Sequence, residues 1–535
     1  MTSPVRSTPD RVYLTTPIYY ASGEPHIGHA YTTFLADALA RYHRQAGAEV
    51  HFLTGTDEHG QKIQEEANRR GITPQELCDQ MAGRFLDAWA ELDISHDRFI
   101  RTTESGHKDV VRAFVQRLHD RGHIYAAEYE GWYSVHEERF FTEKELGPGN
   151  TDPIAGRPVE RIREKNWFFR MSAFQEPLIR HIRENPEWIF PETRRNEVLG
   201  FLQKPLEDLS VSRPRTRLEW GIPLPFDEDH VTYVWVDALI NYLTASGAID
   251  PGAEPGLQGF DEVYEGGRLG RSWWPADLHL TGKDILTTHA VYWPTLLMGA
   301  GLPLPRRILS HGWWVVGDTK MSKSLGNVVD PMALKEKVGT DALRWYLLRE
   351  MPTGSDASYT PERFITRYDE LSNIVGNLAS RALSMIVRYR DGVIPDGPDG
   401  GLSSETETAV ASFHEAMRDL RVNEALGHAM DLGRVANGYV ETREPWAQAK
   451  DPARAADLDE TLASLARVLL VLSALLLPAM PGRMKELAQR LGARDVPTLD
   501  DAQGILLGGS GVEKGLPLFP RLEWEENDAG QDRTR

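Results

Sequence analysis

The sequence predicts an α/β protein in which a parallel sheet, interrupted by an insertion, is followed by an all-α helix bundle. Three observations support this fold class. A strand–loop–helix–strand order opens the 535-residue chain, the same alternation resumes near residue 232 after a stretch that breaks it, and the strand pattern ends beyond residue 361. Alternating strands and helices form doubly wound parallel sheets of the Rossmann type, which bind ligands at the carboxyl ends of their strands.

Composition narrows the class of protein. The chain has 60 basic and 79 acidic side chains, a net charge of −19, 41% apolar residues and one cysteine, Cys78. These values exclude a largely disordered or fibrous chain, an internal disulfide and a zinc site built from a cysteine cluster. The acidic balance disfavours nonspecific coating of nucleic acid. No stretch approaches the roughly 20 apolar residues of a membrane span, and residues 1–10 lack an apolar signal core, so we expect a cytoplasmic protein with no membrane contact.

The first half of the sheet begins with an expected strand at 11–16, where β-branched and aromatic residues follow a polar leader. Residues 26–45 have apolar side chains at a helical period, and a second strand is expected at 49–54. Residues 126–209 break this rhythm with Glu, Arg, Trp and Gly/Pro turns, which indicates an insertion. Strands at 233–236, 277–281 and 307–310 are then expected to complete the sheet.

The remainder of the chain is expected to be helical, because its patterned segments have a helical period and short connections. These helices are expected at 364–390, 404–420, 422–442, 458–477 and 483–491. The expected domains are a leader (1–10), two halves of a catalytic domain (11–125 and 211–330) around the insertion (126–210), a linking segment (331–363), a helical domain (364–500) and a tail (501–535) that frays after residue 511.

Two segments carry candidate chemistry. His26 and His29 flank Gly28 where the first loop turns into a helix, and a helix start offers free N–H groups and partial positive charge to a polyphosphate. Lys320, Ser322 and Lys323 lie in a loop between glycines that could close over a leaving pyrophosphate. Each segment alone could be a satisfied histidine pair or a solvated loop. Their order, each at an α/β loop, favours a nucleotide site.

Together the two segments resemble the ATP-binding signatures of class I aminoacyl-tRNA synthetases, and the chain is similar to the methionyl-tRNA synthetase family. The supporting segments are 15–20, 55–60, 233–238, 282–285 and 341–349. The resemblance implies a ligase that activates methionine with ATP as an adenylate and transfers it to the 3′ end of methionine tRNA, initiator and elongator, with Mg²⁺ accompanying ATP. The two histidines would contact phosphate oxygens, and the two lysines, Lys323 foremost, would neutralise pyrophosphate. Arg213 matches a family arginine of this site, with a surface arginine as the alternative.

A methionine pocket must rely on shape and aromatic enclosure, because the side chain offers only a weak acceptor sulfur on a flexible apolar stem. Asp57 is the candidate partner of the substrate ammonium. The pattern places Trp235 on a strand, with Ala238 and Tyr242 on the face of the following helix; ordinary core packing is the alternative for the apolar positions. The residues that match the family's pocket are Ile18, Tyr20, Trp235, Ala238, Leu239, Tyr242, Ile285 and His289.

For tRNA, the resemblance implicates Asn377 and Arg381, spaced for one helical face, and Trp446 as a stacking platform for single-stranded anticodon bases. A helix cap and a packing tryptophan are the alternative. Many family members carry a zinc knuckle of paired cysteines in the insertion. This insertion has no cysteine, so no metal site is expected, and the excursion would be held by packing of its aromatic residues Trp132, Tyr133, Phe140 and Trp167.

Two further expectations concern assembly and activity. The insertion is too short for the large editing domain of the leucine, isoleucine and valine enzymes, which disfavours those specificities. The chain shows no appended β-barrel of the kind that dimerises some relatives, so we expect a monomer. The alternative function is a synthetase-like paralogue that binds tRNA or a small molecule without charging it. The presence of both signatures and of the candidate anticodon residues favours the ligase.

Overall fold

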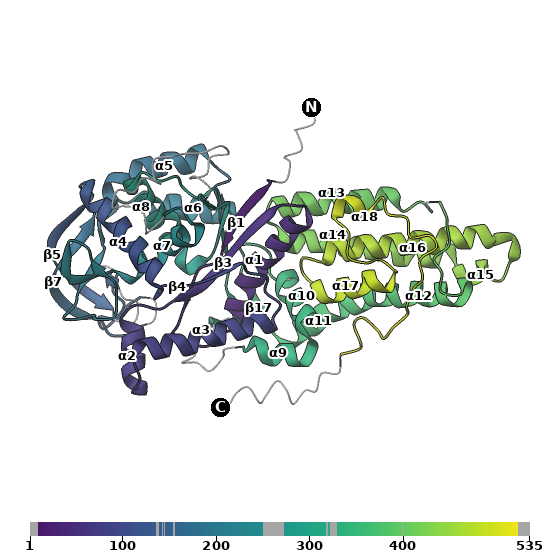
Figure 1. Ribbon diagram of the computed structural model, residues 1–535, viewed down its shortest axis with the longest axis horizontal. Coiled ribbons are helices and arrows are strands. Elements are labelled where there is room, and N and C mark those ends of the chain that lie inside the picture. Colours follow the sequence, from purple (N-terminus) through teal and green to yellow (C-terminus); the bar gives the residue numbers. More distant parts are fainter. Residues whose placement is uncertain are drawn as a thin grey trace.

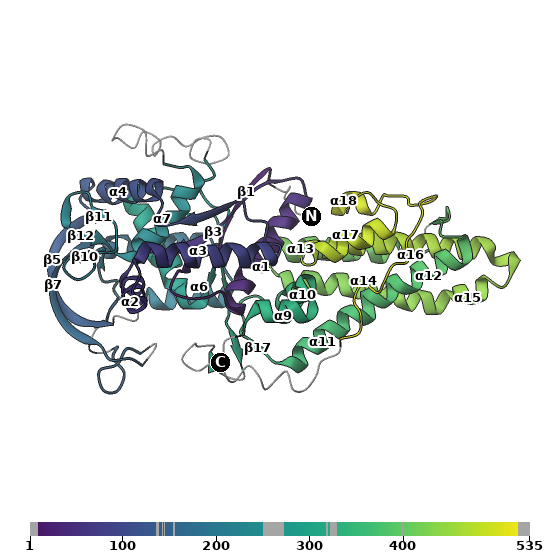
Figure 2. The ribbon, with the colours of Figure 1, turned by 60° about the horizontal axis from the view of Figure 1, so that its bottom comes forward.

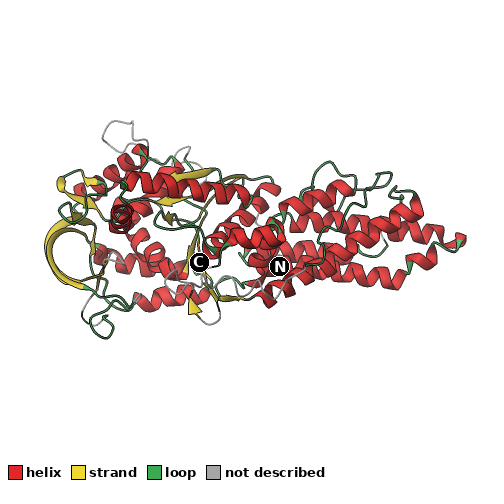
Figure 3. Cartoon of the chain, turned by 90° about the horizontal axis from the view of Figure 1, so that it is seen from below, coloured by secondary structure: helices red, strands yellow, loops and turns green. Residues whose placement is uncertain are grey.

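The α/β half and the helical half of the computed structural model lie end to end along its long axis, with strands confined to one half (Figures 1 and 3). The structure describes residues 9–134, 139–141, 143, 145–153, 156–249, 272–316, 319–320, 329–398 and 400–522. Among these, no helix is both long and apolar enough to cross a membrane.

The centre of the α/β half is a seven-stranded sheet in which every pair of strands is parallel. Strand β3 pairs with β1, β2 and β4, and the sheet continues from β1 through β13 and β14 to β8. The strands are β1 (Arg11–Thr15), β2 (Tyr19–Tyr20), β3 (Glu49–Asp57), β4 (Arg98–Arg101), β8 (Ile189–Phe190), β13 (Leu278–Gly282) and β14 (Ile308–His311). The expected α/β sheet is confirmed.

Helices cover this sheet, and α1 lies between it and the helical half (Figures 1 and 2). Buried alanine and aromatic side chains allow α1 to pack on both sides, whereas α3 begins at a Thr–Glu capping box followed by a proline. The helices of this half are α1 (Ile27–Gln45), α2 (Gln61–Arg70), α3 (Pro74–Glu91), α4 (Ser105–Asp120), α7 (Val234–Ser246) and α8 (Trp293–Ala300).

The stretch between the two half-sheets forms a long antiparallel ribbon at the end of the molecule opposite the helical half (Figure 1). The strands of the ribbon are β5 (Ile124–Ser134), β6 (Arg139–Phe141), β7 (Glu160–Phe169) and β9 (Leu209–Ser210). The same stretch of chain also contains the helices α5 (Gln175–Glu184) and α6 (Glu192–Phe201). A small sheet follows, with β10 (Ser212–Pro214), β11 (Pro223–Leu224) and β12 (Asp227–Thr232).

The aromatic residues of this stretch pack only in part as expected. Tyr133 is buried, with the guanidinium of Arg217 3.9 Å from its ring centre. The indole of Trp167 donates to Asp227 at 2.8 Å and packs edge-on against Phe226. Trp132 is half-buried, and the side chain of Phe140 lies outside the described residues.

A third small sheet, of β15 (Trp314–Val316), β16 (Thr319–Lys320) and β17 (Ala357–Tyr359), completes the strands of the α/β half. The long buried helix α16 forms the axis of the bundle that follows. The helices are α9 (Pro331–Val338), α10 (Thr340–Glu350), α11 (Pro361–Leu371), α12 (Asn377–Arg390), α13 (Ser403–Arg418), α14 (Val422–Arg443), α15 (Pro445–Gln448), α16 (Ala455–Leu476), α17 (Pro481–Arg490) and α18 (Leu499–Ala502).

Three local predictions are wrong. The strand expected at 233–236 is the start of α7, and the strand at this place is β12; α7 is buried on nearly all sides, and an apolar run of that kind does not distinguish a helix from a strand. Residues 189–190 lie within the expected insertion, yet β8 joins the parallel sheet beside β14; two residues are too few to show a pattern. The tail does not fray at residue 511, because Leu518 and Phe519 are buried.

Candidate active site

The candidate residues gather where the parallel strands end. β1 leads to Ile18 and Tyr20, β3 ends at Asp57, and β13 is followed by the turns that carry Ile285 and His289. The start of α1 lies at the same edge, because α1 follows β2. The carboxyl edge of a parallel sheet is where α/β proteins bind ligands, so the fold brings these distant segments together.

The two histidines of the first signature form a capping box at the start of α1. Nδ1 of His26 accepts from the backbone N–H of Gly28 at 3.1 Å, and Nδ1 of His29 accepts from the backbone N–H of His26 at 3.3 Å. The rings are stacked with their centres 3.7 Å apart. Because each ring uses Nδ1 as an acceptor, a neutral imidazole carries its proton on Nε2. Both rings are therefore Nε2–H donors.

The position between the two histidines has no room for a side chain, which explains the glycine there. A β-carbon at Gly28 would lie 3.0 Å from Cε1 and 3.1 Å from Nδ1 of the His26 ring. Such contacts force the neighbouring atoms apart, so the close fit of this ring over the helix start depends on the absent side chain.

A backbone hydrogen bond connects the segment after the second signature to the first signature. Lys320 lies in β16, which pairs with β15, while Ser322 and Lys323 lie outside the described residues. Directly after that loop, the carbonyl of Val329 accepts from the N–H of Ile27, the first residue of α1, at 3.1 Å. The chain that leaves the second signature is thus hydrogen-bonded to the start of the first.

Beside α1 lies a small pocket with a volume of about 70 Å³. All nine residues expected to bind methionine line it, together with three that the sequence did not single out: Pro17, Asn241 and Thr288. Trp235 donates from its indole N–H to the hydroxyl of Tyr20 at 3.0 Å, which ties the two large aromatic walls together. Asp57 is almost fully buried at the end of β3.

The floor of the pocket is a directed hydrogen-bond chain. Nδ1 of His289 lies 3.0 Å from the carbonyl of Ile285, so this nitrogen carries the proton and donates. Nε2 therefore accepts from the hydroxyl of Tyr242 at 2.7 Å. Burial lowers the pKa of His289 to about 4, which keeps the ring neutral at pH 7. An uncharged floor suits an apolar side chain that carries no charge of its own.

A buried network behind the pocket was missed by the sequence reasoning. The carboxylate of Asp237 accepts from Nδ1 of His59 at 2.7 Å and from Nε2 of His107 at 2.8 Å. Burial alone would raise the pKa of Asp237, but the two imidazoles outweigh it and lower this pKa to about 2. The network joins the end of β3, which carries Asp57, to α4 and to the first turn of α7, which carries Trp235.

A second missed contact secures the same strand end. Glu58 is fully buried and accepts from Arg101 Nε at 2.7 Å, and the hydroxyls of Thr56 and Thr103 also donate to it. The indole of Trp220 donates to the Glu58 carbonyl at 2.5 Å. These contacts fix Glu58. Asp57, the preceding residue and the last of β3, is therefore held between Glu58 and the paired strand.

Arg213 is buried, which rules out the surface alternative. Its Nη1 donates to the Ser212 carbonyl at 2.8 Å and to the Ser210 hydroxyl at 3.1 Å, and its guanidinium lies 4.3 Å from the ring centre of Tyr233. Burial opposes the charge, but the two nearby tyrosines outweigh it and raise the pKa of Arg213. The residue is a fixed cation packed against Tyr233, the residue that precedes α7.

The candidate anticodon residues lie in the helical half. Asn377 and Arg381 are one turn apart on α12, and the Arg381 guanidinium lies 6.0 Å from the ring centre of Trp446. Arg381 also pairs with Glu441 at 2.7 Å, and Trp446 is 36% exposed on α15. Figure 1 shows α15 at the tip of the bundle, far from the sheet. The structure thus brings the cation and the indole together at an exposed end.

The comparison with family models decides the assignment. The model of "tRNA synthetases class I (M)" matches residues 12–150 and 149–383. The chain belongs to the methionyl-tRNA synthetases. The methionine–tRNA ligase of Bacillus subtilis (strain 168) is 44% identical over an alignment of 539 positions, gaps included, which covers 97% of this chain and 79% of that protein. The methionine–tRNA ligase of Halalkalibacterium halodurans is also 44% identical over 97% of this chain and 79% of its own length.

Solved methionyl-tRNA synthetases have the same fold. The Mycobacterium tuberculosis enzyme in complex with methionyl-adenylate is 39% identical, with a TM-score of 0.89 over 96% of this chain and all of that one. The apo form of the same enzyme is 37% identical, with a TM-score of 0.83 over 96% of this chain and 99% of that one. The α/β half followed by a helix bundle is therefore the fold of this synthetase family.

The donor set does not fit the zinc knuckle of other synthetases in this family. The only cysteine of the chain, Cys78, lies on α3 and is buried, and the insertion contains none. Across the residues that the structure describes, no group of three or more His, Cys, Asp or Glu side chains is placed to hold a metal ion.

Proposed function

We propose that the chain is a methionine–tRNA ligase that activates L-methionine with ATP and transfers it to the 3′ end of initiator and elongator methionine tRNA. A methionine carboxylate oxygen attacks the α-phosphorus of ATP, and the bond to the bridging oxygen of pyrophosphate breaks. A hydroxyl of the terminal tRNA ribose then attacks the methionyl carbonyl, and AMP leaves. The observation that carries this proposal is the pocket lined by all nine expected methionine residues, with an uncharged Tyr242–His289 floor and a buried carboxylate at Asp57.

The histidine pair supplies hydrogen-bond donors to the reacting phosphate. Because the capping box uses both Nδ1 atoms as acceptors, the Nε2–H groups of His26 and His29 would donate to α-phosphate oxygens as negative charge develops on them. Lys320 and Lys323 would neutralise the departing pyrophosphate, and Ser322 would donate to it. ATP enters as its magnesium complex, whose metal is part of the substrate. Catalysis by this set is positioning and charge stabilisation, since no covalent enzyme intermediate forms.

Methionine would lie with its ammonium at Asp57 and its thioether over the Tyr242–His289 floor. The carboxylate at the end of β3 is held by its buried neighbours, so the ammonium meets a preformed partner. Tyr20 and Trp235 would enclose the stem. Ile18, Ala238, Leu239 and Ile285 complete the apolar walls. Arg213 is proposed to support the same site as a fixed cation.

The anticodon is proposed to bind at the tip of the helix bundle. Trp446 offers an exposed face on which a single-stranded base can stack, and Arg381 and Asn377 offer donors to base edges or phosphates. We further propose that the enzyme acts as a monomer in the cytoplasm.

The test is amino-acid-dependent ATP–pyrophosphate exchange, with leucine, isoleucine, valine and cysteine in parallel with methionine. Exchange with methionine alone is the expected result, followed by charging of methionine tRNA. Absence of exchange with every amino acid, from folded protein, would overturn the ligase and leave a synthetase-like binding protein.

A further inference from the structure

Helix α1 belongs to both halves of the molecule. Its first residues form the histidine capping box, whereas its last three turns face the helical half. The hydroxyl of Tyr42 lies 2.9 Å from Nδ1 of His414 on α13, and the amide of Gln45 donates to the carbonyl of Ala474 at the end of α16 at 3.1 Å. With 19 residues and about 1.5 Å per residue, α1 spans about 28 Å.

A fully buried ion pair joins α1 to α10. Arg344 Nη2 lies 2.5 Å from Oδ2 of Asp37, and both side chains have no exposed surface. The other oxygen of Asp37 accepts from the backbone N–H and the hydroxyl of Ser95, and Arg41 pairs with the same carboxylate. The pKa of Asp37 is lowered, because its arginine partners outweigh the effect of burial. Asp37 is therefore a buried anion whose position is fixed from three directions.

The same arginine also holds the helical half. Its Nε donates to the carbonyl of Ala479 at 2.9 Å and its Nη2 donates to the carbonyl of Pro478 at 3.1 Å, both in the turn between α16 and α17. Its Nη1 reaches the carbonyl of Leu92 after α3 at 3.5 Å. One planar side chain thus binds the histidine-bearing helix, the α/β half and the turn that enters α17. A guanidinium suits this task because its donors have a fixed fork geometry.

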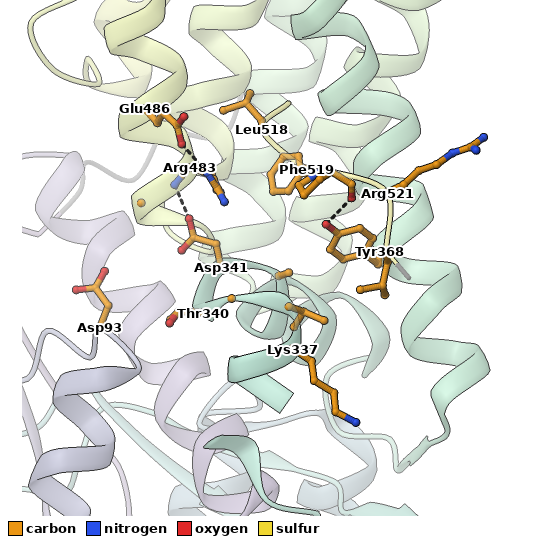
Figure 4. A pocket seen from close by; sticks show the side chains of 16 residues that line it. Asp93, Lys337, Thr340, Asp341, Tyr368, Arg483, Glu486, Leu518, Phe519 and Arg521 are labelled. Atoms are coloured by element: carbon orange, nitrogen blue, oxygen red, sulfur yellow. Dashed lines mark hydrogen bonds and ion pairs between the residues drawn. The ribbon is translucent and has the colours of Figure 1, made fainter. Parts of the chain in front are cut away.

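Beside this joint lies a crevice of about 600 Å³ within the helical half, and Asp93 of the α/β half borders it (Figure 4). The crevice is lined by Asp93 after α3, by the first turn of α10, by the first turns of α17 and by residues 518–522. Across it, the carboxylate of Asp341 accepts from the backbone N–H of Arg483 at the start of α17. Beside this crevice α1, α10, α16 and α17 share one apolar core, and the Arg344–Asp37 pair adds directional contacts that fix the orientation of the helices within it.

We infer that Arg344 and Asp37 are positioning residues for tRNA charging: they fix the anticodon-binding bundle relative to the helix that presents the catalytic histidines. This inference rests on the proposed function. Neither side chain lines the methionine pocket, so adenylate formation does not require the joint. Charging does require it, because the tRNA must be held at the bundle tip and at the adenylate at once.

The test compares Arg344→Gln with the wild-type chain and with Arg367→Gln. Arg367 is a matched control because it pairs with the largely buried Glu350 at 2.7 Å and with Glu370 at 3.1 Å, between α10 and α11, without contacting α1. Thermal unfolding, methionine-dependent pyrophosphate exchange, charging of methionine tRNA and the Kd for an anticodon stem-loop RNA are measured for each protein below its unfolding temperature.

The expected result is a split between the two half-reactions. Arg344→Gln keeps the exchange kcat and the KM for methionine within about threefold and keeps the stem-loop Kd, while its kcat for charging falls at least tenfold; Arg367→Gln keeps all four. Equal losses of exchange and charging would overturn the inference in favour of a structural role. Unchanged charging in the folded variant would also overturn it.

A milder variant covers the case in which Arg344→Gln does not fold, since removing one of the two arginines that pair with the buried Asp37 carboxylate is destabilising. Tyr42→Phe combined with Gln45→Ala removes bonds from α1 to the helical half without burying a charge. It is expected to lower the kcat for charging by two- to fivefold with exchange unchanged, and an unaltered kcat would refute the inference. A wild-type chain without methionine-dependent exchange would instead refute the proposed function.

Discussion

Replacing Asp237 with Asn is the sharpest probe of how the methionine pocket is held. The carboxylate accepts from two imidazoles, His59 and His107, which lie on different segments. An asparagine side chain of the same shape has one oxygen and one NH₂ group. It can accept from one imidazole N–H, but it presents hydrogens to the other. One buried donor therefore loses its acceptor.

The size of the effect follows from two independent considerations. A carboxyl group whose pKa is lowered from 3.8 to about 2 on folding stabilises the folded state by about 2 kcal/mol at neutral pH. A buried donor left without an acceptor costs about 1–3 kcal/mol. We therefore expect Asp237→Asn to lower the free energy of unfolding by about 2–3 kcal/mol at pH 7.

The pH dependence has a definite sign. A lowered carboxyl pKa stabilises the folded state above the unfolded-state pKa, and this contribution is lost as the pH falls through the folded-state value. The difference between wild type and Asp237→Asn should thus be constant above about pH 5 and shrink between about pH 4 and pH 2. Urea unfolding at several pH values measures it. The exposed Asp120→Asn on α4 is the control.

The loss of a hydrogen bond at Asp237 should also shift α7 and so change the binding of methionine. Asp237 lies in the first turn of α7 between Trp235 and Ala238, so a shift of α7 should raise the KM for methionine in pyrophosphate exchange at least fivefold and leave the KM for ATP unchanged. Equal stability of variant and wild type at pH 7, or an unchanged KM for methionine in a destabilised variant, would refute the reasoning.

Four further predictions can be checked with the same assays. Gly28→Ala should lower the exchange kcat at least tenfold without loss of thermal stability, because the added carbon meets the His26 ring while alanine favours the helix. Tyr242→Phe removes the donor to His289 and should lower kcat/KM for methionine by about five- to hundredfold, the range for a buried hydrogen bond of 1–3 kcal/mol. Homocysteine should support exchange, since an apolar pocket discriminates one methylene by only about 1–3 kcal/mol; complete rejection would contradict this. Trp446→Ala should raise the KM for tRNA at least tenfold with exchange intact.

The sequence predicted the sheet and the pocket because both depend on local patterns. Short apolar strands with turns on either side gave β1, β3, β13 and β14 to within a few residues, and matching family segments gave nine candidate methionine-binding residues, which the structure gathers in one pocket. The strand expected at 233–236 is wrong for a physical reason. Burial on all sides of α7 removes the polar face that would have revealed a helical period.

The buried ionic networks could not be predicted, because their members are far apart in the chain. Asp237 lies 178 residues after His59, and Arg344 lies 307 residues after Asp37. Aspartate, histidine and arginine are residue types usually found on protein surfaces, so nothing in the sequence marks these residues as buried. Only the fold shows that their side chains meet, and that the histidines and arginine satisfy carboxylates which burial would otherwise make costly.

One feature of α1 nevertheless points to its partner. Thr32, Thr33 and Asp37 are buried in a helix whose other buried residues are apolar, so this helix is covered on more than one side. A carboxylate there must either bind a proton or meet a cation, because an isolated buried charge is unstable. The guanidinium of Arg344, 2.5 Å from the carboxylate, is that cation, and it lowers the pKa of Asp37. The cation comes from α10, on the side of the helical half, so Asp37 marks the face on which the histidine-bearing helix is joined to the bundle, whereas Thr32 and Thr33 bond to His311 and Tyr19 of the α/β half.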